Sequence, residues 1–267
     1  MKERSKLWEE FYAKGRVEDC PVYDLHGHMG SFSGAYLPRA DADSMIAAMD
    51  RAGVRMLVFS SHAALSSPDI GNATAIAAVR RFPGRLRAYC AVNPNYPDIV
   101  EAEVAGFDRY RDVYVGFKFL SDYHGIAITD ARYEPAWQFA DERGLLILLH
   151  TWGHSQFDGP EPIRKVAEKY RRVKILLGHS CHGEWQKAID LANDFPNVYL
   201  ELTAIPDERG VLEMFVEKAG SQKLLFGTDS PWFNHHYYIG AICGAGITDE
   251  DRRNVFCRNA EKLLGCG

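Results

Sequence analysis

The sequence lacks several features that would assign it to other protein classes. Its six cysteines form no CxxC pair and no dense framework. We therefore expect free thiols in a reducing cytoplasm and no disulfide scaffold. No apolar run approaches the roughly 20 residues of a transmembrane helix. Basic residues are dispersed and the net charge is −5, which disfavours nucleic acid and anionic membranes as partners.

The N-terminal residues 1–15 are charged and amphipathic, without the apolar core of a secretory signal. They predict a short helix. No linker-like or low-complexity stretch divides the remaining chain, and 46% of its 267 residues are hydrophobic. We therefore expect a single domain over residues 1–267 with one sizeable core, and leave open whether it forms a homo-oligomer.

Eight short apolar runs are rich in β-branched, aromatic and leucine residues and are bounded by Gly, Pro or charged clusters. Such runs predict β-strands. They lie at residues 21–28, 54–60, 87–93, 114–120, 145–150, 173–179, 197–202 and 223–229.

Segments with the apolar spacing of helices follow each run, several with Asp, Asn or Pro at the start and Gly at the end. Eight strand and helix pairs in about 250 residues are the pattern of a (β/α)8 TIM barrel. A doubly wound open sheet would have fewer strands, and no glycine-rich phosphate loop follows the first strand. The helices are predicted at residues 41–53, 71–84, 98–110, 131–144, 159–172, 183–196, 209–220 and 248–265.

Polar residues with metal-binding or catalytic chemistry stand at the ends of these strands. His26 and His28 are two residues apart on the first strand, so both can face the barrel mouth and chelate one divalent ion. The fourth, fifth, sixth and eighth strands end in Lys118, His150, His179 and Asp229. Apolar residues precede them on the expected inward face: Leu146 and Leu148 before His150, Ile175 and Leu177 before His179, and Leu225 before Asp229.

The chain resembles the amidohydrolase superfamily, and within it the amidohydrolase-related branch of small hydrolases and nonoxidative decarboxylases. The resemblance covers essentially the whole chain. It rests on DLHGH (24–28), LLH (148–150), LLGHS (176–180), LLFGTDSPW (224–232) and RNAEKLLG (258–265).

The resemblance implies a metal site and roles for its residues. His26, His28, His150 and Asp229 correspond to metal ligands, and His179 to a catalytic or second-metal histidine. Imidazole and carboxylate suit Zn, our first expectation, and also Mn, Fe or Co. Such an ion would activate water at neutral pH. Asp229 would then accept the proton.

His179 would polarise the substrate or stabilise a developing oxyanion. Lys118 has three interpretations. We expect an unmodified ammonium that holds a substrate carboxylate. The alternatives are a carboxylated lysine bridging two metals, as in binuclear members of the superfamily, and a lysine that points outward. Asp24, on the same strand as His26, is expected either to orient a ligand or to be satisfied by backbone donors.

The loops after the strands should frame the pocket. Residues 29–43 form a long predicted loop suited to a lid, and residues 230–246 form an aromatic-rich one. With Trp152 and Tyr123 they predict a partly aromatic pocket for a small cyclic or unsaturated substrate. Arg39, His154 and His182 are pocket candidates by position alone.

The expected activity is metal-dependent hydrolysis of a small lactone, amide or ester-like compound. The alternative is nonoxidative decarboxylation of an aromatic or muconate-type acid, which the same ligand set would serve. Hydration of an unsaturated acid and a non-catalytic metal-binding barrel are the remaining interpretations. Because this fold hosts many chemistries, fold alone does not choose among them.

Overall fold

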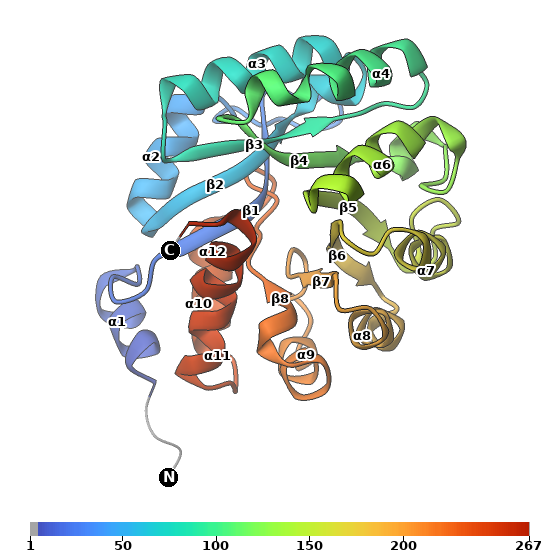
Figure 1. Cartoon of the computed structure of the whole chain (residues 1–267). Helices are drawn as coiled ribbons and strands as arrows, with labels where there is room; N and C mark the ends of the chain where they lie inside the picture. Colours follow the sequence, from blue (N-terminus) through green and yellow to red (C-terminus); the bar gives the residue numbers. More distant parts are fainter. Residues whose placement is uncertain (1–4, 267) are drawn as a thin grey trace.

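The chain forms a parallel β-barrel surrounded by helices, as a computed structural model that describes residues 5–266 shows (Figure 1). All neighbouring strands pair in parallel and in chain order from β1 to β8. The predicted (β/α)8 barrel is therefore confirmed. The strands are β1 (Val22–Met29), β2 (Val54–Ser61), β3 (Leu86–Ala91), β4 (Tyr114–Phe119), β5 (Leu146–Trp152), β6 (Lys174–His182), β7 (Val198–Glu201) and β8 (Leu224–Leu225).

The barrel closes irregularly between β8 and β1. The predicted eighth strand, 223–229, is too long, because regular pairing with β7 ends at Leu225. Beyond it the chain runs along β1, where Leu25 N–H donates to Phe226 O (2.9 Å) and Asp229 N–H donates to His26 O (2.7 Å). A left-handed backbone at Asp229 (φ 54°) breaks the extended conformation there. The distortion lies where the segment after β8 passes His26 on β1.

Helices form the outer ring (Figure 1), with capping signals where the sequence predicts them. For α2, the Asp41 side chain accepts from Ser44 N–H (3.0 Å), and Gly53 (φ 77°) terminates the helix. The helices are α1 (Lys6–Lys14), α2 (Ala42–Ala52), α3 (Pro68–Arg81), α4 (Pro97–Gly106), α5 (Ser121–His124), α6 (Glu134–Arg143), α7 (Pro160–Lys169), α8 (Trp185–Asp194), α9 (Val211–Ala219), α10 (His235–Gly244), α11 (Asp249–Arg253) and α12 (Asn259–Leu264).

Two predicted segments differ from the structure. The aromatic-rich loop 230–246 contains α10, whose apolar residues surround the helix axis and so give no amphipathic pattern. The last predicted helix, 248–265, is divided into α11 and α12 by a π-helical segment, Asn254–Arg258. Residues 1–4 of the predicted N-terminal helix lie outside the described residues, and α1 covers residues 6–14 of it, with Ser5 and Gly15 as its caps.

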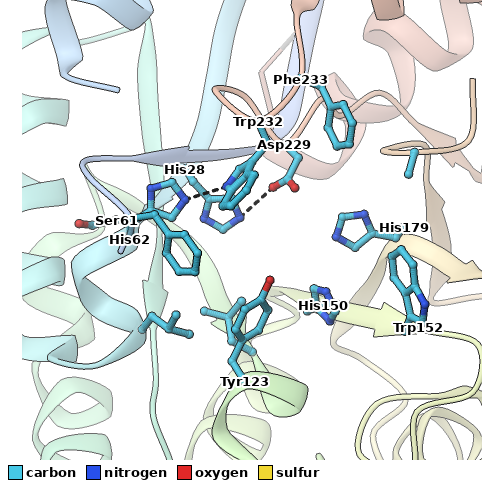
Figure 2. Close-up of a pocket in the computed structure, with 14 residues that line it drawn as sticks. His28, Ser61, His62, Tyr123, His150, Trp152, His179, Asp229, Trp232 and Phe233 are labelled. Atoms are coloured by element: carbon cyan, nitrogen blue, oxygen red, sulfur yellow. Dashed lines mark hydrogen bonds and ion pairs between the residues drawn. The ribbon is translucent and has the colours of Figure 1, made fainter. Parts of the chain in front are cut away.

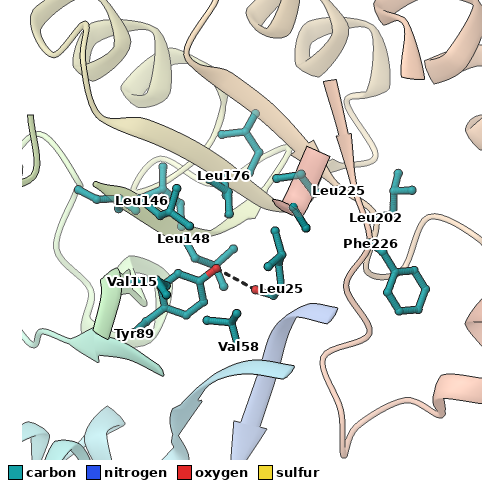
Figure 3. Close-up of a cluster of buried hydrophobic side chains, with 14 of the residues drawn as sticks. Leu25, Val58, Tyr89, Val115, Leu146, Leu148, Leu176, Leu202, Leu225 and Phe226 are labelled. Carbon is teal, nitrogen blue, oxygen red and sulfur yellow. Dashed lines mark hydrogen bonds between the residues drawn. The ribbon is translucent and has the colours of Figure 1, made fainter. Parts of the chain in front are cut away.

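Apolar side chains fill the barrel below the polar strand ends (Figure 3). Leu148, Leu176 and Leu225 meet there, and the Tyr89 hydroxyl donates to Leu25 O (2.9 Å). Each fully buried leucine contributes about 1.5–3 kcal/mol to folding. This packed layer supports the polar residues at the C-terminal ends of the strands. In residues 5–266, no helix has the length and apolar character needed to cross a membrane.

Candidate metal centre and pocket

Three predicted ligands meet at the barrel mouth. His26 and His28 on β1 and Asp229 beyond β8 each place one ligand atom within 4.8 Å of the other two. Asp229 Oδ1 lies 3.0 Å from His28 Nε2 and 3.4 Å from His26 Nε2 (Figure 2). All three residues are largely shielded from solvent.

The hydrogen bonds around these residues allow three acceptor atoms to face one another. His26 Nδ1 lies 2.8 Å from Glu201 Oε2, and a carboxylate can only accept, so this nitrogen carries the hydrogen. His28 Nδ1 lies 3.1 Å from Ser60 Oγ, which can accept from it. Asp229 Oδ1 is buried and receives no hydrogen bond. Two imidazole nitrogens and a carboxylate oxygen that converge in this way are ligands a divalent metal ion takes, so the donor set fits such an ion.

Glu201, at the end of β7, connects this cluster to β6. Its carboxylate accepts from His26, from His179 N–H (3.1 Å) and from both Thr203 N–H (2.8 Å) and Thr203 Oγ1 (2.6 Å). Gly227 provides the necessary space, because a Cβ there would lie 2.0 Å from Glu201 Oε1. Burial raises the pKa of Glu201 to about 7. The sequence analysis missed this residue, although its signal was the same as for the others: a charged residue at a strand end.

Lys118 is fully buried on β4, with Nζ 3.2 Å from His26 Nε2. The outward-pointing interpretation is therefore wrong. The ammonium does not line the pocket either; it approaches the nitrogen that a metal would use. Burial lowers the pKa of Lys118 to about 8. Burial, and then the charge of Lys118, lower the pKa of His26 well below its usual value, which favours the neutral imidazole that a metal needs.

His150 stands slightly apart from the three converging ligands, outside their cluster. Its Nδ1 faces two carboxylates, Asp158 Oδ2 at 3.5 Å and Asp122 Oδ2 at 3.9 Å. A carboxylate behind one ring nitrogen is the usual support of a metal-binding histidine, whose other nitrogen takes the ion. His150 thus stays a predicted ligand through Nε2, and neither carboxylate was predicted.

His179 reaches the same site through unusual backbone geometry. Its ring centroid lies 5.2 Å from that of His26 and 5.0 Å from that of His150, and its Nδ1 is buried without a partner. Residues 179–181 all have positive φ, which costs about 1–2 kcal/mol per non-glycine residue. Hydrogen bonds from Ser180 Oγ to Glu201 O and from Cys181 N–H to Thr151 Oγ1 hold this turn.

A cavity of about 220 Å³ opens above the cluster (Figure 2). His28, His150, His179 and Asp229 line one part of it, and most of the remaining wall is aromatic or aliphatic. As predicted, Tyr123 and Trp152 belong to the wall. The other lining residues are Phe32, Ser61, His62, Leu65, Leu120, Ala204, Trp232 and Phe233.

His62 is a pocket residue that the sequence analysis did not single out. Its Nδ1 donates to Gly30 O (2.7 Å), and its Nε2 accepts from Trp232 Nε1 (2.9 Å). Its ring stacks on His28 with centroids 5.0 Å apart. Burial, followed by the neighbouring His28, lowers the pKa of His62 to about 4. His62 therefore holds the Trp232 side chain in place at the cavity wall.

Four other candidates lie outside the cavity lining. Asp24 accepts from the backbone N–H groups of His26 and Thr228, as one of its two interpretations expected, and also from the Thr228 hydroxyl. His154 is exposed beside Glu184. His182 stacks behind Trp152 at 4.5 Å, and Arg39 lines a separate hollow.

Solved structures of similar fold include several decarboxylases. A 2,6-dihydroxybenzoate decarboxylase from Rhizobium has a TM-score of 0.76 and 16% identity, with 92% of this chain and 99% of that chain covered. A 5-carboxyvanillate decarboxylase from Novosphingobium aromaticivorans, complexed with manganese and 4-hydroxy-3-methoxy-5-nitrobenzoic acid, has a TM-score of 0.72 and 13% identity (92% and 96% covered). A dihydroxybenzoic acid decarboxylase from Polaromonas, with bound manganese and the inhibitor 2-nitroresorcinol, has a TM-score of 0.73 and 18% identity (92% and 97% covered).

At these identities the structural likeness establishes the fold. No curated protein sequence matches the chain. The sequence model of the amidohydrolase family, in contrast, matches residues 23–266, which includes the barrel from the second residue of β1 onward and all the candidate site residues. The chain therefore belongs to the amidohydrolase family.

Proposed function

We propose that this protein is a metal-dependent nonoxidative decarboxylase of a small aromatic acid. The observation that carries the proposal is the position of the converging His26, His28 and Asp229 atoms at one side of a small, mainly aromatic cavity. Such a cavity suits a flat ring whose polar group faces the ligands. The decarboxylase neighbours support this activity over hydrolysis, which the sequence first suggested.

In this proposal the ligands are His26, His28, Asp229 and His150. A bound divalent ion would supply positive charge against the substrate's oxygens. Zn was expected from the residue types, and the manganese in two neighbours makes Mn an equal candidate. Glu201 and Ser60 hold the two β1 imidazoles with Nε2 toward the ion.

The reaction requires a proton at the ring carbon. When the carbon–carbon bond to the carboxylate breaks, its electron pair stays on the ring and carbon dioxide leaves, so that carbon must be protonated. We assign this step to Asp229, whose Oδ1 faces His26 and His28; its other carboxylate oxygen takes a proton from solvent and passes it to the ring carbon. His179 donates a hydrogen bond to a substrate oxygen. The aromatic wall excludes water around the ring.

Lys118 takes a different role from the one first expected. Because its ammonium lies against His26 and not in the cavity lining, we propose that it balances the buried negative charge of Asp229 and Glu201. Metal binding at His26 Nε2 then requires Lys118 to release that nitrogen.

Carbon dioxide release tests the proposal. The metal-free protein, reconstituted with Mn²⁺ or Zn²⁺ in parallel, is given a panel of hydroxybenzoic acids and a matched panel of aryl esters and lactones. We expect the amount of carbon dioxide released to equal the amount of acid consumed. The Asp229→Asn variant should lose this activity. Metal-dependent ester or lactone hydrolysis without any carbon dioxide release would instead support the hydrolase activity.

A further inference from the structure

The cavity has an uneven distribution of charge. Four of its ionisable groups, His28, His150, His179 and Asp229, gather around the candidate metal centre. The rest of the wall is mainly apolar and includes Phe32, Leu65, Leu120, Trp232 and Phe233. Among the described residues that line it there is no lysine or arginine.

The polar groups on this wall are not suited to bind an anion. His62 uses both ring nitrogens, one to donate to Gly30 O and one to accept from Trp232, so it has no further N–H to offer. Tyr123 brings a hydroxyl toward the cavity (Figure 2), which can bond a neutral hydroxyl group as well as an anion.

The nearby cations lie elsewhere. Lys118 is fully buried beside His26. Arg39 and Arg51 line a neighbouring hollow of about 280 Å³, which shares Trp232 and Phe233 with the cavity. These two aromatic side chains belong to both walls, whereas neither arginine belongs to the lining of the cavity.

We propose that the pocket selects aromatic acids with a single anionic group, which it holds at the candidate metal centre, and rejects a second carboxylate that would lie against the apolar lining. This inference rests on the proposed decarboxylase function. The physical reason is desolvation, because a carboxylate buried against apolar side chains loses its hydration and gains no cationic partner. A neutral substituent of the same shape avoids this penalty.

Three ring compounds that differ at one position test the inference without turnover. They are 2-nitroresorcinol, 3,5-dihydroxy-4-nitrobenzamide and 3,5-dihydroxy-4-nitrobenzoate, in which the nitro group replaces the departing carboxylate. Calorimetry on the manganese-loaded protein gives the three Kd values. The carboxamide and carboxylate have nearly equal size, so their ratio isolates charge. We expect the carboxylate to bind at least about tenfold more weakly than the carboxamide.

A substitution at Phe233 should have the opposite effect on carboxylate binding. This residue is suitable because it lines the cavity and is partly exposed. Phe233→Arg should reduce the carboxamide preference at least about tenfold by supplying the missing partner, and Phe233→Gln, polar but uncharged, should not. Wild-type binding of the carboxylate equal to or tighter than that of the carboxamide would overturn the inference alone. Failure of all three compounds to bind the metal-loaded protein would overturn the proposed function and this inference with it.

Discussion

Replacing Glu201 with Gln should weaken metal binding although Glu201 is not a ligand. The carboxylate receives His26 Nδ1–H and His179 N–H at one oxygen and two Thr203 donors at the other. Gln has one acceptor oxygen and one NH2 group. If its oxygen stays with Thr203, the NH2 group faces the hydrogens of His26 and His179, and this clash favours the His26 tautomer whose Nε2 cannot bind a metal.

The loss of such a supporting carboxylate typically costs 10–100-fold in metal affinity, or about 1.4–2.8 kcal/mol. Competition with a chromophoric chelator at pH 8 measures the Kd for Mn²⁺. At that pH wild-type Glu201 is mainly ionised, because burial raises its pKa only to about 7. Glu217→Gln, the same change at an exposed position on α9, controls for charge.

Glu201→Asp keeps the charge but shortens the side chain, so it should lie between wild type and Gln. Circular dichroism and thermal melting of each variant confirm that it is folded before its Kd is compared. An unchanged Kd in a folded Glu201→Gln protein would refute the role of Glu201 in orienting His26.

Four further predictions follow from the same geometry. His26→Ala should lose bound metal, whereas Asp229→Asn should keep much of it and lose most turnover; elemental analysis beside the activity assay separates the two. Asp158→Asn should weaken Mn²⁺ binding about tenfold if His150 is a ligand held from behind, and an unaltered Kd would remove His150 from the ligand set. The Lys118→Met variant should still bind one metal per chain, and the intact mass of the wild-type protein in carbon dioxide-rich buffer should not increase. A carbamate on the wild-type lysine, together with loss of metal in the variant, would instead make Lys118 a bridging ligand. Burial lowers the pKa of His124. Below about pH 6.5 the unfolded chain therefore binds a proton at this residue that the folded chain does not bind, and the free energy of unfolding falls as the pH falls. Urea denaturation at pH 7 and pH 5 should therefore show a smaller loss for His124→Gln than for wild type.

The parts of the fold and site that depend on local patterns could be predicted from the sequence. The alternating His26 and His28 pair is one such part, because two residues on one strand need no distant partner to face the same side. His150 at the end of an apolar strand is another. The positions of the strands were predictable for the same reason. The predicted eighth strand was too long because the turn at Asp229 depends on hydrogen bonds to β1.

The rest depends on contacts between distant residues. Glu201 meets His26 across 175 positions, and Trp232 meets His62 across 170. The position of Glu201 at a strand end marks it as a candidate, but nothing in the residues around it indicates that it contacts His26. Simple strand alternation also fails at His179. A Cβ on Gly178 would lie 3.1 Å from the His26 ring, so position 178 faces the barrel interior. In a regular strand the next side chain, His179, would then point out of the barrel, and only the left-handed backbone from residue 179 brings it to the cavity.

Stepwise addition of Mn²⁺ to metal-free protein, with bound metal and carbon dioxide release from 2,6-dihydroxybenzoate followed together, tests the central claim most directly. We expect carbon dioxide release to rise in proportion to the first equivalent of metal per chain and then to level off, because one ion completes the site at His26, His28, His150 and Asp229. Full occupancy of that first equivalent without release from this or any other hydroxybenzoic acid, or release that persists in the metal-free protein, would contradict the account.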